Sequence, residues 1–525
     1  MKILVTDNLS EEGIKILKEE GFEVEETGKL PPQQLKEKIK GIVALIVRSG
    51  TKVTAEVIQN ADALKIIGRA GVGLDNIDLE EATRKGIMVM NTPTGNTISA
   101  AEHTISLLLS LARNIPQAND ALKKGVWDRK KFMGVEVFGK TLGVVGLGRV
   151  GTHVARCALG LGMRVITYDP FISREKAKNL GVEWVEWEKL LSEADFITFH
   201  VPLTPHTKYL VGEKEFRLMK KGVRIINCSR GGIIDEKALY EAIKSGKVKG
   251  AALDVFEKEP PEDSPLLQLP EVIVTPHLGA STYEAQYNVA VEMGRQISDA
   301  LKRGIYRNVV NLPQLSPEEW VNAQGYLQLC EKLGSFQGQR LKESLKEVRI
   351  EYLGEVNISN LSLLTSGILK GLFSTMLPGS ITYVNAHLFA EERGIKVTER
   401  RDSKSEDFAS LISVETKTSK EASKVSGTLF SGSIPRIVKV DQFHVEINPQ
   451  GPLLLCYNVD RPGLIGKIGS LLGKEGINIA QMTFDRKVKG GEAITVLNLD
   501  SSPESKVLEK IREIPEVKGI EFLEL

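Results

Sequence analysis

The sequence has little of what marks secreted, membrane or nucleic-acid-binding proteins. Four of its 525 residues are cysteine, and they lie far apart, which argues against a disulfide framework and against a zinc ribbon. No apolar run approaches the ~18 residues of a membrane-spanning helix, and the charged Lys2 precedes any signal-peptide core. The 69 Lys and Arg against 68 Asp and Glu leave a charge of +1, so nucleic acid and acidic membranes are not expected as partners. We therefore expect a soluble cytoplasmic protein without a metal site.

The composition is otherwise that of a globular protein with several domains. Hydrophobic residues make up 42% of the chain and charged residues 26%, which is ordinary for soluble proteins. At roughly 150 residues per domain, the length predicts three or four domains.

Two long segments alternate short apolar runs with amphipathic stretches, a pattern that predicts parallel sheets covered by helices on both faces. In the first segment we predict strands over 3–5, 42–47, 66–67 and 87–90 and helices over 9–20 and 32–40. A helix over 97–112 leads to the second segment, where we predict six strands over 142–145, 165–168, 196–201, 225–227, 251–255 and 272–274. Six such strands match a dinucleotide-binding sheet, and an amphipathic helix over 281–303 closes this part.

The rest of the chain differs in character. The segment 311–317 holds two prolines and predicts a linker. Beyond it we predict a mixed region, with a strand over 348–352, helices over 361–372 and 384–392, and a polar hairpin or loop over 402–424. That region holds no catalytic motif, so we expect a structural or oligomerising role. From residue 452 the predicted order is βαββαβ, the ferredoxin-like arrangement, over 453–459, 463–475, 477–486, 492–499, 502–514 and 517–523.

A glycine pattern lies between the first strand and first helix of the second segment. Gly146 permits a tight turn, Gly148 lets the backbone approach a pyrophosphate, and Gly151 allows close packing of helix and strand. Asp169 ends the next strand, 23 residues after the first glycine, where a carboxylate accepts both ribose hydroxyls and repels a 2′-phosphate. The pattern predicts an NAD site; the alternative is a glycine turn and a helix-capping aspartate in another α/β protein.

Three side chains suited to alcohol oxidation follow strands of the same sheet. Removing a hydride from an alcohol carbon requires a base for the hydroxyl proton and a cation for the substrate oxygens. His277 suits the base, Glu259 can orient it, and the planar fork of Arg230 suits a carboxylate. Because ligands bind at the carboxyl ends of such strands, these residues predict one site; taken singly, each could be an ordinary turn or surface residue.

Together these segments resemble the D-isomer-specific 2-hydroxy-acid dehydrogenases, and among them the long-form members that act on 3-phosphoglycerate and end in an ACT domain. The resemblance covers about residues 1 to 310 and rests on the segments 68–78, 91–93, 146–151, 227–236, 251–261 and 277–282. It implies a flavodoxin-like substrate domain over 1–96 and 281–310 and an inserted Rossmann NAD-binding domain over 97–280. It further implies an α+β intervening domain over 311–450 and an ACT regulatory domain over 451–525.

The resemblance also assigns roles to residues. It implies that His277 is the proton donor and acceptor, Glu259 its partner and Arg230 the substrate-orienting cation. The residues that match the family's NAD contacts, beside the glycine loop, are Val72, Arg149, Val150, Asp169, Val201, Cys228, Ser229, Arg230, Asp254, His277, Leu278, Gly279 and Ala280. Arg48 and Arg69 follow strands and suit the substrate phosphate, with surface charges as the alternative. Arg129 lies in a segment that resembles one reaching into a neighbouring subunit's site.

The terminal βαββαβ unit resembles an ACT domain, a small-molecule sensor, and the resemblance implies L-serine as its ligand. Asp460 and Asn478 have the groups to bind a small polar ligand across a subunit interface. Asn458 stands where some relatives have histidine or tyrosine, which puts serine sensitivity in question. The alternative is a unit that only pairs subunits. In either case we expect a homo-oligomer, a dimer or a tetramer.

Three functions remain open on the sequence. The leading one is NAD-dependent oxidation of 3-phosphoglycerate to 3-phosphohydroxypyruvate, the first step of L-serine synthesis. A second is reduction of another 2-oxo acid, such as glyoxylate, hydroxypyruvate or 2-oxoglutarate. A third is a non-catalytic protein that senses NAD(H) or serine. Turnover separates the first two from the third.

Overall fold

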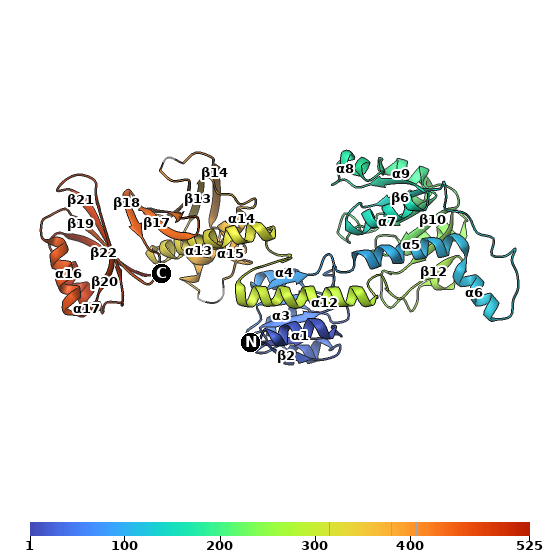
Figure 1. Ribbon diagram of the computed structural model, residues 1–525, viewed down its shortest axis with the longest axis horizontal. Coiled ribbons are helices and arrows are strands. Elements are labelled where there is room, and N and C mark those ends of the chain that lie inside the picture. The colour runs from blue at the N-terminus through green and yellow to red at the C-terminus, as the bar shows by residue number, and fades with distance from the viewer. Residues whose placement is uncertain (314, 378, 380, 406) are drawn as a thin grey trace.

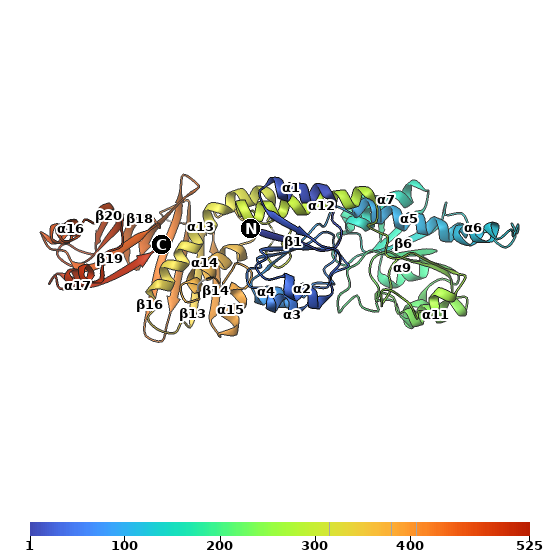
Figure 2. The same cartoon turned by 90° about the horizontal axis from the view of Figure 1, so that it is seen from below.

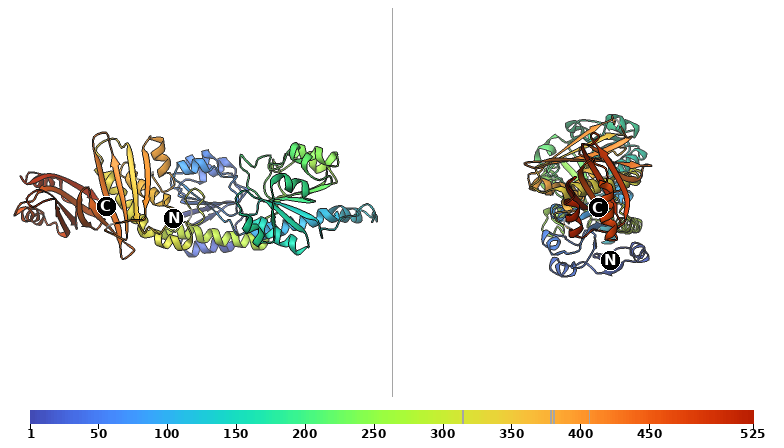
Figure 3. Two further views of the ribbon diagram at one scale, coloured as in Figure 1. Left: turned by 90° about the horizontal axis from the view of Figure 1, so that it is seen from above. Right: turned by 90° about the vertical axis from the view of Figure 1, so that its left-hand side faces the viewer.

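The computed structural model describes residues 1–313, 315–377, 379, 381–405 and 407–525. The described residues form four sheets in an elongated row, with the N-terminal unit near the middle and the C-terminal unit at one end (Figures 1 and 2). The same row is seen from two further sides in Figure 3. Within these residues, no helix has both the length and the apolar character needed to span a bilayer.

The N-terminal unit is a parallel sheet in the order β2-β1-β3-β4-β5, the flavodoxin-like order. Its strands are β1 (Lys2–Val5), β2 (Glu23–Glu26), β3 (Ala44–Val47), β4 (Ile66–Arg69) and β5 (Met88–Asn91). Its helices are α1 (Glu11–Glu19), α2 (Pro32–Lys38), α3 (Ala55–Asn60), α4 (Leu79–Arg84) and, from much later in the chain, α12 (Tyr283–Ser298). Helices α1 and α12 cross closely because both carry glycine at the contact: a Cβ on Gly13 would lie 2.5 Å from the carbonyl oxygen of Ala290.

The second unit is a seven-stranded parallel sheet in the order β12-β11-β10-β9-β6-β7-β8, which is the Rossmann order with one strand added. Its strands are β6 (Thr141–Val145), β7 (Arg164–Tyr168), β8 (Glu183–Trp184), β9 (Phe196–Phe199), β10 (Val223–Asn227), β11 (Val248–Leu253) and β12 (Val272–Val274). Its helices are α5 (Thr97–Arg113), α6 (Ile115–Lys123), α7 (Arg149–Gly160), α8 (Arg174–Asn179), α9 (Trp187–Glu193), α10 (Glu213–Leu218) and α11 (Glu236–Lys244), with a short 3-10 turn, η1 (Pro265–Gln268), further on. The π-helical turn η2 (Asp299–Arg303) continues α12 of the N-terminal unit. The prediction of six strands was wrong by one, because β8 has only two residues and no apolar run to announce it.

The third unit packs helices on one mixed sheet. The sheet order is β14-β13-β15-β16-β17-β18, with β13 and β14 parallel and the other pairs antiparallel. The strands are β13 (Glu347–Gly354), β14 (Lys396–Asp402), β15 (Ser410–Lys417), β16 (Ala422–Phe430), β17 (Ile434–Val440) and β18 (Phe443–Ile447). The helices are α13 (Pro317–Arg340), α14 (Ser362–Ser374) and α15 (Ala386–Glu392). The predicted strand, both predicted helices and the hairpin reading are confirmed, but α13, β14, β17 and β18 were not foreseen.

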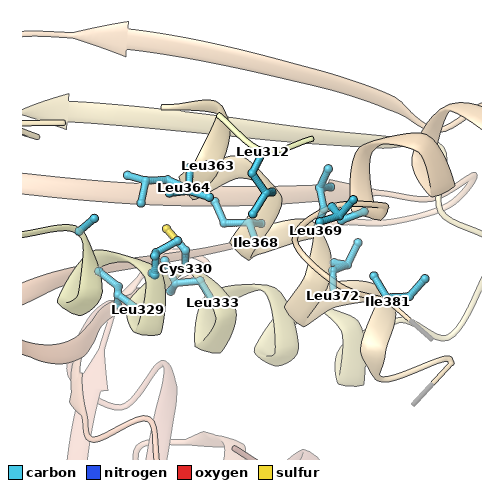
Figure 4. Close-up of a cluster of buried hydrophobic side chains, with 14 of the residues drawn as sticks. Leu312, Leu329, Cys330, Leu333, Leu363, Leu364, Ile368, Leu369, Leu372 and Ile381 are labelled. Carbon is cyan, nitrogen blue, oxygen red and sulfur yellow. The ribbon is translucent and has the colours of Figure 1, made fainter. Parts of the chain in front are cut away.

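Helices α13 and α14 lie against each other through small residues. A Cβ on Gly334 would stand 2.0 Å from the carbonyl oxygen of Ile368, and one on Gly371 would stand 2.1 Å from that of Glu331. Only glycine permits such an approach of two backbones. Buried leucines, isoleucines and Cys330 fill the space beside the crossing (Figure 4).

The C-terminal unit has the predicted βαββαβ order. It comprises β19 (Pro452–Val459), α16 (Leu464–Lys474), β20 (Ile479–Arg486), β21 (Glu492–Leu499), α17 (Ser505–Arg512) and β22 (Val517–Glu524), in the antiparallel sheet order β20-β21-β19-β22. It meets the third unit at Arg340, the last residue of α13, whose side chain is 7% exposed. The Arg340 guanidinium pairs with Glu521 at 2.8 Å and Asp441 at 2.8 Å and donates to the hydroxyl of Tyr457 at 2.9 Å.

Candidate active site

The predicted base and its acid are in contact. The Nδ1 atom of His277 lies 2.8 Å from Oε2 of Glu259, and Oε1 of Glu259 accepts from the backbone N–H of Phe256 at 3.2 Å. The carboxylate is thereby fixed at both oxygens. His277 has φ +56°, a conformation that a non-glycine residue adopts only when its surroundings hold it there.

Asp254 holds the loop that carries His277. Its side chain is fully buried, and its carboxylate accepts from the hydroxyl of Thr275 at 2.6 Å and from the N–H groups of Leu278 at 2.7 Å and Gly279 at 2.9 Å. Burial works to raise the pKa of this carboxyl, but the hydrogen bonds, including one from His103, outweigh burial and hold the pKa below its ordinary value. Asp254 therefore stays charged, and its buried carboxylate holds the backbone of Leu278 and Gly279 next to His277.

Arg230 reaches the same pocket from the end of β10. A pocket of about 300 Å³ is lined by both Arg230 and His277. The Nε atom of Arg230 donates to Oδ2 of Asp75 at 3.0 Å, and the NH1 atom of Arg230 donates to the carbonyl of Ser229 at 2.7 Å. Asp75 belongs to the N-terminal unit and Arg230 to the Rossmann unit, so this ion pair bridges the two.

Two further arginines line a smaller neighbouring pocket of about 120 Å³. Arg48 follows β3 and Arg69 ends β4, and the Nε atom of each is buried without a hydrogen-bond partner among the described residues. Burial lowers the pKa of Arg69 to about 10, and repulsion by the nearby charge of Arg230 is the next largest cause of the shift. Arg230 and His277 line this pocket as well. Three guanidiniums around one small pocket form a site for an anion with several charged oxygens.

The glycine loop has the geometry that a dinucleotide needs. Gly146 has φ +89°, and a Cβ on Gly151 would stand 2.1 Å from the carbonyl of Gly146. The space above Gly148 is open, since a Cβ there would meet nothing within 4 Å. The N-terminus of the 12-residue helix α7 follows directly, with its free N–H groups and positive dipole end. This arrangement fits the pyrophosphate of NAD.

Other predicted cofactor residues surround this loop. The carboxylate of Asp169 accepts from the N–H groups of Leu147 at 2.8 Å and Phe171 at 2.9 Å, so it is fixed beside the loop. The predicted contacts that line the 300 Å³ pocket are Val72, Arg149, Val150, Val201, Cys228, Ser229, Arg230, His277, Gly279 and Ala280. Burial raises the pKa of Cys228 to about 12, so its thiol is neutral.

Comparison with known proteins places the chain. Residues 105–279 match the D-isomer specific 2-hydroxyacid dehydrogenase NAD binding domain, residues 322–441 the D-3-phosphoglycerate dehydrogenase intervening domain, and residues 453–516 the ACT domain. The D-3-phosphoglycerate dehydrogenase of Methanocaldococcus jannaschii is 48% identical over 100% of both chains, and that of Bacillus subtilis is 42% identical over 100% of this chain and 99% of its own. The chain belongs to the D-3-phosphoglycerate dehydrogenase family.

Solved structures of D-lactate dehydrogenases match the first part of this family member. The Aquifex aeolicus enzyme complexed with NAD and lactic acid is 32% identical, with a TM-score of 0.51, over 57% of this chain and 96% of that one. The apo enzyme of Escherichia coli is 30% identical, with a TM-score of 0.53, over 59% and 99%. The predicted fold, family and cofactor, NAD, are confirmed.

Arg129, predicted to serve a substrate site, lies away from these pockets. It is exposed in the segment after α6, beside the exposed Trp127 and Met133. It does not line either pocket of its own chain.

The three predicted effector residues are apart within one chain. Asn458 is buried on β19 and accepts from the hydroxyl of Thr495 at 3.0 Å. Asp460 pairs with Arg486 at 2.6 Å. Asn478 donates to Asp500 at 2.7 Å. Asp460 follows the last residue of β19, whereas Asn478 precedes β20 at the end of the sheet where β19 begins, so the two side chains lie at opposite ends of the sheet.

Two histidines to which the sequence assigned no role are part of the site's framework. His103 lies with Nε2 3.1 Å from the hydroxyl of Thr275 and 3.2 Å from Asp254. His200 lines the larger pocket, and burial lowers its pKa to about 3, so it is neutral. Asp75 was also missed, because nothing in a sequence shows that an acid will pair with an arginine 155 residues away.

Proposed function

We propose that this protein oxidises 3-phosphoglycerate at C2 to 3-phosphohydroxypyruvate with NAD, the first step of L-serine synthesis. The observation that carries the proposal is the contact between His277 and Glu259. His277 also lines a pocket with Arg230, and the neighbouring pocket adds Arg48 and Arg69. The names of the full-length relatives support the same substrate.

In the proposed reaction NAD, when bound, accepts the hydride from C2. Because Nδ1 of His277 is bonded to Glu259, Nε2 is the nitrogen left to take the hydroxyl proton. The Glu259 carboxylate stabilises the imidazolium that forms, and it keeps the ring in one orientation. The oxidised product is the 2-oxo acid, and the reverse reaction returns the proton from Nε2.

The arginines divide the substrate between them in this proposal. Arg230, held at Nε and NH1, presents its remaining N–H groups to the substrate carboxylate. Arg48 and Arg69 take the phosphate, whose charges also relieve the repulsion among the three guanidiniums. A 2-hydroxy acid without a phosphate leaves two half-buried arginines without an anionic partner, and this makes it the poorer substrate.

The test is NAD reduction with 3-phosphoglycerate beside D-glycerate, which lacks the phosphate. We expect kcat/KM to favour the phosphorylated acid by at least about a hundredfold, the ~3 kcal/mol of a charge-assisted contact. In an Arg69→Gln variant this preference falls while D-glycerate turnover stays the same. Equal rates on both acids would point to another 2-oxo acid as the substrate. A protein that binds NADH but turns over neither acid would be a nucleotide-sensing protein rather than an enzyme.

We further propose that L-serine binds between the ACT units of two copies, so that the protein works as a dimer or tetramer. The separation of Asp460 from Asn478 within one chain supports this arrangement. Serine inhibition that is lost in Asn478→Ala, at an unchanged uninhibited rate, is the expected result. Inhibition that persists in this variant would move serine to another site, and a monomer in sedimentation would contradict the shared site.

A further inference from the structure

One ion pair crosses between the two catalytic units at the site. Asp75 lies in the loop between β4 and α4, and its Oδ2 accepts from Nε of Arg230 at 3.0 Å. The Arg230 side chain is 27% exposed and that of Asp75 is 59% exposed, so the carboxylate of the pair is the more solvent-exposed partner. Asp75 has no part in the proposed proton or hydride transfer.

The contacts of Arg230 leave it one orientation. Its NH1 donates to the carbonyl of Ser229 at 2.7 Å, and a Cβ on Gly73 would stand 1.9 Å from its NH2. The guanidinium therefore lies close to Gly73 of the opposite unit, and the absence of a side chain there gives it room. Asp75 takes the Nε side of the fork, which leaves the NH1–NH2 side for a ligand, and Arg230 lines both pockets.

We propose that Asp75 is a positioning residue that aims Arg230 at the substrate carboxylate from across the cleft. This inference rests on the proposed function. A guanidinium binds a carboxylate best with two parallel N–H groups, and it has two such edges. With the Nε edge held by Asp75, the substrate meets the other edge at a fixed angle. Because Asp75 belongs to the opposite unit, Arg230 is aimed when the two units stand as they do in this structure.

A charge effect alone predicts the opposite result. The pocket holds Arg48, Arg69 and Arg230, and their mutual repulsion is relieved in part by Asp75. If Asp75 served only to balance charge, its removal would make the pocket more positive and bind an anionic substrate more tightly, lowering KM. If Asp75 positions Arg230, its removal weakens binding and raises KM. The sign of the change in KM separates the two.

The experiment compares Asp75→Asn and Asp75→Glu with the wild type, using NADH and 3-phosphohydroxypyruvate. Glu80→Gln is the matched control, since Glu80 is an exposed acid on the adjacent helix that pairs with Arg84. We expect Asp75→Asn to raise KM about tenfold, equivalent to about 1.4 kcal/mol, with kcat within about threefold. Asp75→Glu keeps the carboxylate and shows a smaller rise. Glu80→Gln and all values of Kd for NADH stay unchanged.

The outcomes are distinguishable. A KM that is unchanged or lower in Asp75→Asn, in a preparation that binds NADH normally, overturns the positioning role and leaves the proposed function standing. Equal rises in KM for Asp75→Asn and Glu80→Gln also overturn it, because Glu80 has no contact with Arg230 and the rise would then not depend on that contact. A wild-type protein that turns over none of the 2-oxo acids overturns the proposed function and this inference with it.

Discussion

The loop of His277 depends on one buried carboxylate, and an Asp254→Asn substitution tests that dependence. Asparagine keeps one oxygen and replaces the other with an NH2 group, which is a donor. In one orientation this donor faces the N–H of Gly279, and in the other it faces the hydroxyl of Thr275 and the N–H of Leu278. Two donors facing each other in a buried site leave at least one of them unsatisfied. Each such group costs about 1–3 kcal/mol.

The loop can avoid this conflict only by moving, and His277 moves with it. A misplacement of 1 Å in a catalytic group costs about a hundredfold in rate, so we expect kcat to fall by about that factor. Binding of NADH, followed by fluorescence, should weaken far less than kcat, because the glycine loop lies elsewhere and only the predicted contacts at 277–280 move with the loop of His277. Asp263→Asn is the control, as Asp263 is an exposed acid in the same region. An unchanged kcat in Asp254→Asn would refute the claim that this carboxylate holds the catalytic loop.

The same residue makes the stability of the fold depend on pH. The pKa of Asp254 is lower in the folded protein than its ordinary value, so the charged form is favoured by folding. The stability that it contributes is present above the ordinary carboxyl pKa and is lost as the pH falls through the lower folded value. Asp254→Asn should therefore flatten the acid side of the unfolding profile, and an identical acid limb in both proteins would contradict this.

Three further predictions concern the cofactor, the helix crossing and the joint with the ACT unit. Asp169→Ala should reduce the preference for NAD over NADP by about tenfold or more in kcat/KM, and an unchanged ratio would refute the ribose assignment. Gly334→Ala should lower the free energy of unfolding by about 1–3 kcal/mol, because the new Cβ meets the carbonyl oxygen of Ile368. Gly466→Ala should not lower it, because the space around Gly466 is open. Arg340→Met leaves Asp441 and Glu521 without their partner; since both are partly exposed, we expect a loss of about 2 kcal/mol, seen as faster proteolysis between the last two units. Unchanged proteolysis would show that this joint does not depend on the ion pairs.

Much of the site could be predicted because its parts follow short, regular signals. The glycine loop, Asp169, Arg230 and His277 each come directly after a buried strand, and parallel strands bring their carboxyl ends to one edge. The βαββαβ unit was predicted in full, because its apolar runs alternate cleanly with polar turns. In these places local pattern and tertiary structure agree.

The rest depends on contacts between distant segments. Helix α13 was not predicted. Its three glycines, Gly325, Gly334 and Gly338, are unfavourable in a helix interior, yet Gly334 and Gly338 admit the backbone of α14. The strand β8 has only two residues and pairs with β7 over those alone. The bond between Asp75 and Arg230 forms only once two units have folded and met. The framework role of His103 depends on Asp254 and Thr275, which lie far along the chain in the same unit.

The most direct test of the account is a side-by-side assay of the wild type and His277→Ala with NADH and 3-phosphohydroxypyruvate, with NADH binding measured on the same samples. We expect fast turnover by the wild type and a loss of at least about a thousandfold in the variant, at nearly equal NADH affinity. Retained turnover in His277→Ala would contradict the assignment of the base. Loss of NADH binding in a folded variant would contradict the separation of the catalytic pair from the cofactor site.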